Sequence, residues 1–422
     1  MSNLIFKNIA QLVTMRGPNR LRKGQEMRDV EILENGYVVV QGDTIIDIGT
    51  GDGYRNYMDN NTEVVDASGL VMTPGLVDSH THLVHGGSRE HELTMKLEGY
   101  SYLDILRAGG GILNTVKKTR KTSFEDLYEK AKKSLDIMVC FGTTTVEAKS
   151  GYGLDFDTEI KQLEVAKRLN DSHPVDIVST FMGAHAYPEE YKHNHDAFLE
   201  IVIKMLPYIK EHNLAEFCDV FCEREVFSYD ESRYILEKAK AYGFKLKIHA
   251  DEMDSIGAVD IACTLGCVSA DHLVETKDED FTKLAKHDIV ANLLPATSFN
   301  LNKNYAKARQ MIEMGCGLAL STDYNPGSSP TENIQLVMQL AGLKLKMTPK
   351  EILTAVTING ACAVKREKEI GSIEVGKKAD LVLFAVPNID YLVYHFGINH
   401  VKDVYKNGKL VVHNQVICYE EE

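Results

Sequence analysis

The chain has 422 residues, of which 44% are hydrophobic and 26% charged, a composition typical of a soluble globular protein with an ample core. Its formal net charge of -14 disfavours nucleic acid and anionic membranes as partners, because both require a basic face on the protein. A small anionic substrate would need a local arginine or lysine. The length allows two or three domains, or one large α/β barrel with a smaller companion.

Eight cysteines are spread along the chain without the dense spacing of a disulfide scaffold, so free thiols in a reducing compartment are expected. The first residues lack the apolar core of a secretion signal, and no apolar run is long enough to span a membrane. These features predict a cytoplasmic protein that acts on a small molecule. The sequence leaves open whether the chain forms a homodimer.

The two ends of the chain share a pattern of β-branched runs separated by turn residues, in segments 1–68 and 372–422. No helix-period segment interrupts the N-terminal runs. Near the C-terminus, Asn407-Gly408 stands between two apolar runs, which is a hairpin signal. We therefore predict one small composite β-sandwich domain that is formed from both termini.

Residues 69–371 alternate strand-like runs with helix-like runs. The strand candidates are 76–82, 143–149, 175–184, 217–223, 244–250, 268–272, 288–294 and 317–322. Ser123 and Thr348 stand as N-cap residues before helices predicted over 124–138 and 349–356. Eight such β/α units predict a (β/α)8 barrel. A doubly wound sheet is the alternative, but no Gly-x-Gly-x-x-Gly follows the first of these strands.

The pair His80 and His82 ends the first of these strands. Residues i and i+2 of an extended strand share a face, so both imidazoles can reach one metal ion. Active residues of a barrel lie at the C-terminal strand ends, where His249 and Asp323 also fall. We predict His80, His82, His249 and Asp323 as ligands of a single Zn²⁺ or Fe²⁺ ion. Glu223 ends the fourth strand, where a two-metal site would place a bridging lysine, and so favours one ion.

Three residues at this rim are candidates for catalysis. A metal held there would activate a water molecule, and Asp323 is placed to accept the proton of that water. Glu252, three residues past His249, would protonate a departing nitrogen, and His272 would orient the water or polarise a carbonyl. For Glu252 the alternative is a solvated loop carboxylate.

The stretch Thr73–His82 is the signature of the amidohydrolase superfamily, and its flanks resemble the imidazolonepropionase family. The matching stretches, which span nearly the whole chain, are 73–92, 101–111, 143–154, 179–186, 247–252, 269–273 and 321–335. The resemblance implies metal-dependent hydrolysis of the cyclic amide C–N bond of 4-imidazolone-5-propanoate, a step of histidine degradation. Water would attack the ring carbonyl to give N-formimino-L-glutamate.

The same resemblance implies a set of substrate-binding positions. They are Arg89, Tyr152, His185, Glu252, Asn325, Gly327 and Ser328. The residue type of Arg89 suits a propanoate carboxylate held in two hydrogen bonds, whereas the alternative is a surface arginine. Tyr102 and Tyr152 would close over the ring, with core packing as their alternative. Ala296 and Asn300 depart from the family pattern and bear on the pocket wall after the seventh strand.

Two rival functions fit parts of the pattern. A purine or pyrimidine deaminase of the same superfamily would hold a neutral base and would not need Arg89. A non-catalytic barrel that serves as a binding protein would be expected to have lost its ligands, and all four are present.

Overall fold

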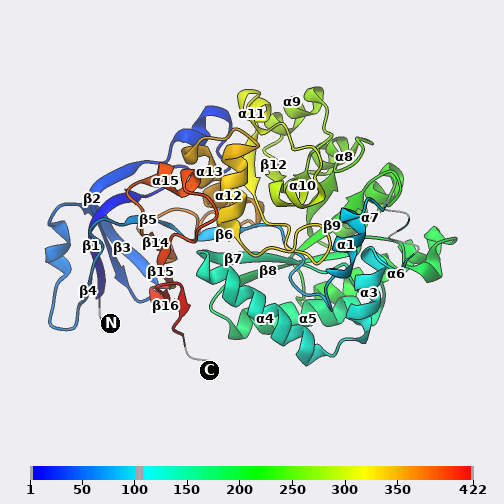
Figure 1. The fold of residues 1–422 in the computed structure, drawn as a ribbon, viewed down its shortest axis with the longest axis horizontal. Helices are drawn as coiled ribbons and strands as arrows, with labels where there is room; N and C mark the ends of the chain where they lie inside the picture. Colours follow the sequence, from blue (N-terminus) through cyan, green and yellow to red (C-terminus); the bar gives the residue numbers. More distant parts are fainter. Residues whose placement is uncertain (1–2, 101–103, 105–107, 420–422) are drawn as a thin grey trace.

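The computed structural model describes residues 3–100, 104 and 108–419, and it has two sheets (Figure 1). One sheet, formed from the two ends of the chain, lies to the side of a barrel that is formed from the middle of the chain. Tyr102, a predicted substrate residue, lies outside the described residues.

The barrel has eight strands, and each described pair of neighbours is parallel and consecutive in the sequence. The strands are β6 (Leu76–Asp78), β7 (Thr143–Lys149), β8 (Asp176–Ala184), β9 (Phe217–Cys222), β10 (Lys245–Ala250), β11 (Ser269–His272), β12 (Val290–Leu293) and β13 (Gly317–Leu320). The predicted barrel is thus confirmed, and each strand candidate contains one of its strands.

The barrel closes just beyond β6 and β13. Asp323 N donates to His80 O at 3.0 Å, and His82 N donates to Tyr324 O at 2.9 Å. The regular strand β6 therefore ends at Asp78, earlier than the predicted residue 82. The residues up to 82 form the seam, the place where the first and last strands of the barrel meet. Backbone hydrogen bonds at this seam thus hold three of the predicted ligands, His80, His82 and Asp323.

Helices surround the barrel strands. They are α1 (His91–Leu97), α3 (Ile112–Lys121), α4 (Phe124–Cys140), α5 (Phe156–Ser172), α6 (His195–Glu211), α7 (Tyr229–Ala241), α8 (Ala258–Leu265), α9 (Asp278–Lys286), α10 (Pro295–Leu301), α11 (Ala308–Glu313), α12 (Ile334–Leu343), α13 (Pro349–Val356) and α14 (Ile358–Ala363). Ser123 caps α4 and Thr348 caps α13, as predicted. Within the described part of the chain, no helix has the length and apolar character needed to cross a membrane.

Both ends of the chain contribute strands to the second sheet. These are β1 (Asn3–Val13), β2 (Ile32–Gln41), β3 (Thr44–Thr50), β4 (Glu63–Asp66), β5 (Val71–Pro74), β14 (Leu381–Phe384), β15 (Val401–Lys406), β16 (Lys409–His413) and β17 (Val416–Ile417). The two termini meet where β5 pairs with β14, which confirms the predicted separate β structure formed from both ends of the chain. Its hairpin turn is Asn407-Gly408, with φ values of 50° and 74°. Helix α15 (Ile389–Tyr394) joins β14 to β15.

The chain passes from one sheet to the other at Gly75. β5 belongs to the terminal sheet, whereas β6 pairs with β7 of the barrel. A Cβ atom at position 75 would lie 2.1 Å from Thr144 Oγ1, so the crossing requires glycine. We propose the two-domain division predicted from the sequence, with β5 completing the terminal sheet.

Candidate metal centre and active site

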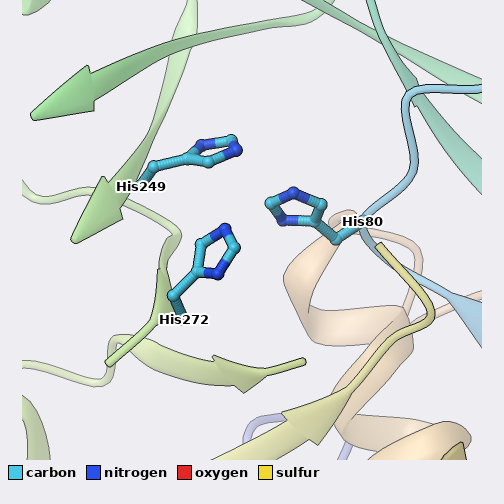
Figure 2. A group of neighbouring side chains, drawn as sticks. All are labelled: His80, His249 and His272. Carbon is cyan, nitrogen blue, oxygen red and sulfur yellow. The ribbon is translucent and has the colours of Figure 1, made fainter. Parts of the chain in front are cut away.

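Five buried side chains meet at the C-terminal rim of the barrel. They are His80, His82, His249, His272 and Asp323. The first two follow β6, the next two belong to β10 and β11, and Asp323 follows β13. Figure 2 shows the rings of His80, His249 and His272 turned toward one another. The structure thus brings the four predicted ligands together and adds His272 to them.

The donor atoms form two overlapping groups that share His80. One group is His80 with His249 and His272, the other is His80 with His82 and Asp323, and the atoms of each lie within 4.8 Å of one another. Asp323 Oδ1 lies 3.5 Å from His80 Nε2 and 3.7 Å from His82 Nε2. Ligands about 2 Å from a tetrahedral ion would be separated by roughly 3.3 Å, so these spacings suit a divalent cation.

Buried histidine nitrogens without a hydrogen-bond partner are evidence on whether these residues could bind a metal. His80 Nε2 and His249 Nε2 are buried and have no hydrogen-bond partner among the described residues. His80 Nδ1, in contrast, lies 2.6 Å from Asp271 Oδ2, so Nδ1 carries the proton and Nε2 presents its lone pair. An unsatisfied buried polar atom costs about 1–3 kcal/mol, which a bound cation would relieve. The donor set therefore fits a divalent metal.

The protonation states of the cluster follow from burial. Burial lowers the pKa of His80 and His82 well below the ordinary value, so both imidazoles stay neutral, the form that binds a metal. Burial also acts to lower the pKa of His249, but the Asp219 carboxylate outweighs it and raises that pKa. Burial raises the pKa of Asp323. A cation bound among these groups would oppose the last two shifts.

Backbone strain and a side-chain contact orient the catalytic candidates. His272 and Asp323 have φ values of 76° and 53°, a region that non-glycine residues seldom adopt outside sites where the surroundings impose it. Thr297 Oγ1 donates to Asp323 Oδ2 at 2.6 Å, which leaves Oδ1 to face the histidines. Sequence reasoning did not find Thr297, although it lies between Ala296 and Asn300, because only the fold brings α10 to Asp323.

Glu252 lies beside His272. Its Oε2 atom is 3.6 Å from His272 Nε2, and its side chain is 17% exposed, so it stands at the border of the buried cluster and solvent. Glu223 has a different position: its carboxylate accepts from the backbone N–H groups of Arg224 and Met253 at 3.1 and 3.0 Å. Glu223 thus ties the loop after β10 to the loop after β9.

Two predicted substrate residues lie beside the ligand group. The ring of His185 stacks on that of His82, with centroids 4.7 Å apart and planes 8° from parallel. Tyr152 has its ring centroid 5.2 Å from His185 and 5.6 Å from His82. Burial raises the pKa of Tyr152, so its hydroxyl stays protonated. Together these rings form a wall of the site.

Arg89 lies against Gly327 and is held by Glu92. Its Nε and Nη2 atoms both donate to the Glu92 carboxylate at 2.8 Å, and Glu92 also accepts from Gly111 N at 2.7 Å. A Cβ atom at Gly327 would lie 2.0 Å from Arg89 Nη1. Two N–H groups of Nη1 and one of Nη2 therefore remain for another acceptor. Glu92 was missed from the sequence, although its i+3 spacing from Arg89 on a helical run is a signal for such a pair.

The loop after Asp323 is organised by Asn325. Its Oδ1 accepts from the N–H groups of Gly327 and Ser328 at 2.8 Å each, and its Nδ2 donates to Asp323 O at 2.6 Å. The Asn325 side chain thus shapes the loop that Arg89 touches. Asn300, one of the two departures from the family pattern, donates from Nδ2 to Ser328 O at 2.9 Å and joins α10 to this loop.

Comparisons with known proteins agree with this geometry. The Amidohydrolase family model matches residues 71–411. The chain is 57% identical over 415 residues to the imidazolonepropionase of Alkaliphilus metalliredigens, with 98% of each chain covered. It is 52% identical over 414 residues to the imidazolonepropionase of Streptococcus pyogenes serotype M3, again with 98% of each covered.

Solved structures share the fold at much lower identity. An adenosine deaminase from Xanthomonas campestris with bound zinc has a TM-score of 0.74 and 17% identity, with 100% of this chain and 95% of that chain covered. The guanine deaminase of E. coli has a TM-score of 0.75 and 14% identity, with 98% and 100% covered. These likenesses show the amidohydrolase barrel alone, whereas the curated relatives identify the group within it. The chain belongs to the imidazolonepropionases of the amidohydrolase family.

Proposed function

We propose that this enzyme hydrolyses the cyclic amide C–N bond of 4-imidazolone-5-propanoate to N-formimino-L-glutamate in histidine degradation. One observation in particular supports the proposal. The guanidinium group of Arg89 has N–H groups that Glu92 does not use, and it lies on a loop beside the buried cluster of histidines and Asp323. The substrate has a planar ring, which the rings of Tyr152 and His185 can flank, and a carboxylate, which the guanidinium group of Arg89 can bind.

The proposed cofactor is a single Zn²⁺ or Fe²⁺ ion held by His80, His82, His249 and Asp323. The unpartnered Nε2 atoms of two of these histidines support the assignment. Such an ion, when bound, lowers the pKa of a water molecule and so supplies a nucleophile at neutral pH.

The residues of the chain supply the proton transfers. Asp323 has Oδ1 facing the histidines while Oδ2 accepts from Thr297, and its carboxylate accepts a proton of the attacking water. His272 polarises the ring carbonyl, and Glu252 at the solvent border protonates the departing nitrogen. The water oxygen thus joins the carbonyl carbon and the C–N bond breaks. Glu252 gives its proton to the nitrogen, and the proton that Asp323 took from the water returns to Glu252 through solvent.

The propanoate group binds at the free edge of Arg89. Because Glu92 occupies Nε and one N–H of Nη2, the substrate carboxylate takes N–H groups of Nη1 and Nη2. Lys96 Nζ, 3.4 Å from Gly327 O, adds a second positive charge near this edge. Tyr152 and His185 flank the imidazolone ring, and Ser328 and Gly327 line the loop on the carboxylate side.

An assay for loss of imidazolonepropanoate absorbance tests the proposal, with guanine and cytosine as control substrates. We expect turnover of imidazolonepropanoate and no release of ammonia from either base. Deamination of a base without turnover of imidazolonepropanoate would instead establish the rival function. We place the reaction in the cytoplasm, which the free state of all eight cysteines supports.

A further inference from the structure

The barrel interior next to the ligand cluster holds five charged side chains, none more than 1% exposed. They are Glu147, Lys149, Asp219, Lys247 and Asp271. They come from β7, β9, β10 and β11, and the proposed reaction gives none of them a role. Burying a charged side chain costs free energy unless the charge is paired. Five such side chains in one barrel core are therefore expected to have a role in the site beside them.

Lys149 connects the carboxylates of this group. Its Nζ atom lies 2.7 Å from Asp219 Oδ2, 3.0 Å from Glu147 Oε1 and 3.7 Å from Asp271 Oδ2. Burial acts to lower the pKa of Lys149, but Asp219 and Glu147 outweigh it and raise that pKa, so the ammonium group stays charged. Lys247 Nζ holds the other oxygen of Glu147 at 2.8 Å.

Two of these carboxylates reach proposed metal ligands. Asp271 Oδ2 lies 2.6 Å from His80 Nδ1, and Asp219 Oδ2 lies 3.0 Å from His249 Nδ1. Asp219 Oδ1 also accepts from the backbone N–H of His249 at 3.2 Å. His80 Nδ1 is hydrogen-bonded to Asp271, so Nε2 is the nitrogen left for the cluster. Asp219 and the His249 ring lie at ion-pair distance, and neither ring nitrogen of His249 has a hydrogen-bond partner among the described residues.

We propose that Lys149 is a positioning residue for the metal centre. It fixes Asp271 and Asp219. Asp271 holds His80 in the Nδ1–H tautomer with Nε2 directed at the cluster, and Asp219 holds the place of His249 through its backbone N–H and an ion-pair contact with its ring. Carboxylate partners of this kind orient a histidine ligand and raise its basicity. The inference rests on the proposed metal site but concerns different residues, so the two can fail separately.

Zinc affinity tests the inference directly. Zn²⁺ is titrated into the metal-free full chain in competition with a chromophoric chelator, for the wild type and for K149M, D271N and D219N. We expect each variant to bind Zn²⁺ about 10–100-fold more weakly than the wild type. Asp380 provides the matched control, because it is buried and paired with Lys406 at 2.6 Å in the terminal domain. D380N should bind Zn²⁺ as the wild type does, and unchanged affinity in the three barrel variants would overturn the inference.

A second measurement is made on the wild type itself, and variants serve only to assign the signals. Nitrogen NMR of the metal-free wild type, labelled at histidine, reports which ring nitrogen of His80 and His249 carries the proton, with H80Q and H249Q to assign the signals. We expect the Nδ1–H tautomer at His80, where Asp271 meets Nδ1, and the opposite tautomer there would refute the positioning role. A wild type that has the expected tautomer at His80 but binds no Zn²⁺ would contradict the proposed metal site, and not the contact by which Asp271 fixes His80.

Discussion

Arg89 contacts Glu92 along one edge of its guanidinium group and leaves the other edge unused, because Nε and Nη2 each donate to the Glu92 carboxylate at 2.8 Å. The pair keeps the arginine in place before any substrate arrives. A preoriented cation loses less conformational freedom on binding than a mobile one. The free edge, which lies over Gly327, is therefore where a substrate carboxylate is expected.

Gly327→Ala should displace Arg89 and weaken substrate binding. The new Cβ would lie 2.0 Å from Arg89 Nη1, and the far end of that side chain can move while the backbone stays. Loss of a charged hydrogen bond of about 1.5–3 kcal/mol predicts a fall in kcat/KM of roughly 10–100-fold, mainly through KM.

Steady-state kinetics and thermal melting of Gly327→Ala, Arg89→Ala and the double variant check this prediction. Because both changes act on one contact, the double variant should be no worse than Arg89→Ala alone. Additive losses in kcat/KM, or an unchanged KM in Gly327→Ala, would show that the two residues do not cooperate in binding.

Glu252→Gln should retain the metal and lose turnover. The amide keeps the shape of the side chain but cannot deliver a proton to the departing nitrogen, so kcat should fall by about 10²–10⁴-fold. Metal content by elemental analysis and kcat are the two readouts. Glu275→Gln, an exposed carboxylate on the loop after β11, is the control and should keep the wild-type kcat. A normal kcat in Glu252→Gln would assign the proton donation to another group.

The barrel was predictable because its strands are short apolar runs bounded by turn residues, and because active groups of this fold gather at one rim. His80, His82, His249 and Asp323 all lie at such strand ends, so the sequence alone placed them together. The helix starts at Ser123 and Thr348 were equally visible, since capping depends on residues close in the sequence.

What the sequence could not show depends on contacts between distant segments. Asp271 and Asp219 lie in ordinary strand positions, and only the closed barrel brings them to His80 and His249. Thr297 meets Asp323 for the same reason. The place of β5 in the terminal sheet is set by its pairing with β14, more than 300 residues away in the chain.

Removal of the metal should abolish activity and lower stability. We expect about one Zn²⁺ or Fe²⁺ ion per chain, and free metal at about 100 times its dissociation constant would stabilise the fold by about 2.7 kcal/mol. Elemental analysis, activity after chelation and re-addition, and melting with and without metal are the measurements. His82→Ala should lose the ion, whereas His413→Ala, an exposed histidine of β16, should keep it. Full activity of the metal-free chain would contradict the proposed mechanism.

Glu351 should make the stability of the fold depend on acid pH. Its carboxylate is fully buried, lies 2.9 Å from Arg28 Nε and accepts from Arg309. Burial acts to raise its pKa, but Arg309, the Thr348 backbone and Arg28 outweigh this and lower the pKa from 4.5 to about 2. Because the folded-state pKa lies below the unfolded-state value, the stabilisation is complete above pH 4.5 and is lost as the pH falls to about 2.

Glu351→Gln should therefore lower the free energy of unfolding by about 2–3 kcal/mol at neutral pH, and by progressively less as the pH falls through this window. Denaturant unfolding of wild type and variant at several pH values, with chelator present, measures the difference. Glu26→Gln is the matched control, since the pKa of Glu26 is also about 2 through Arg20. The Glu26 side chain is 44% exposed, however, so its surface pair should contribute only about 0–1 kcal/mol. A pH-independent difference for Glu351→Gln would mean that packing, and not the charge of Glu351, stabilises the start of α13.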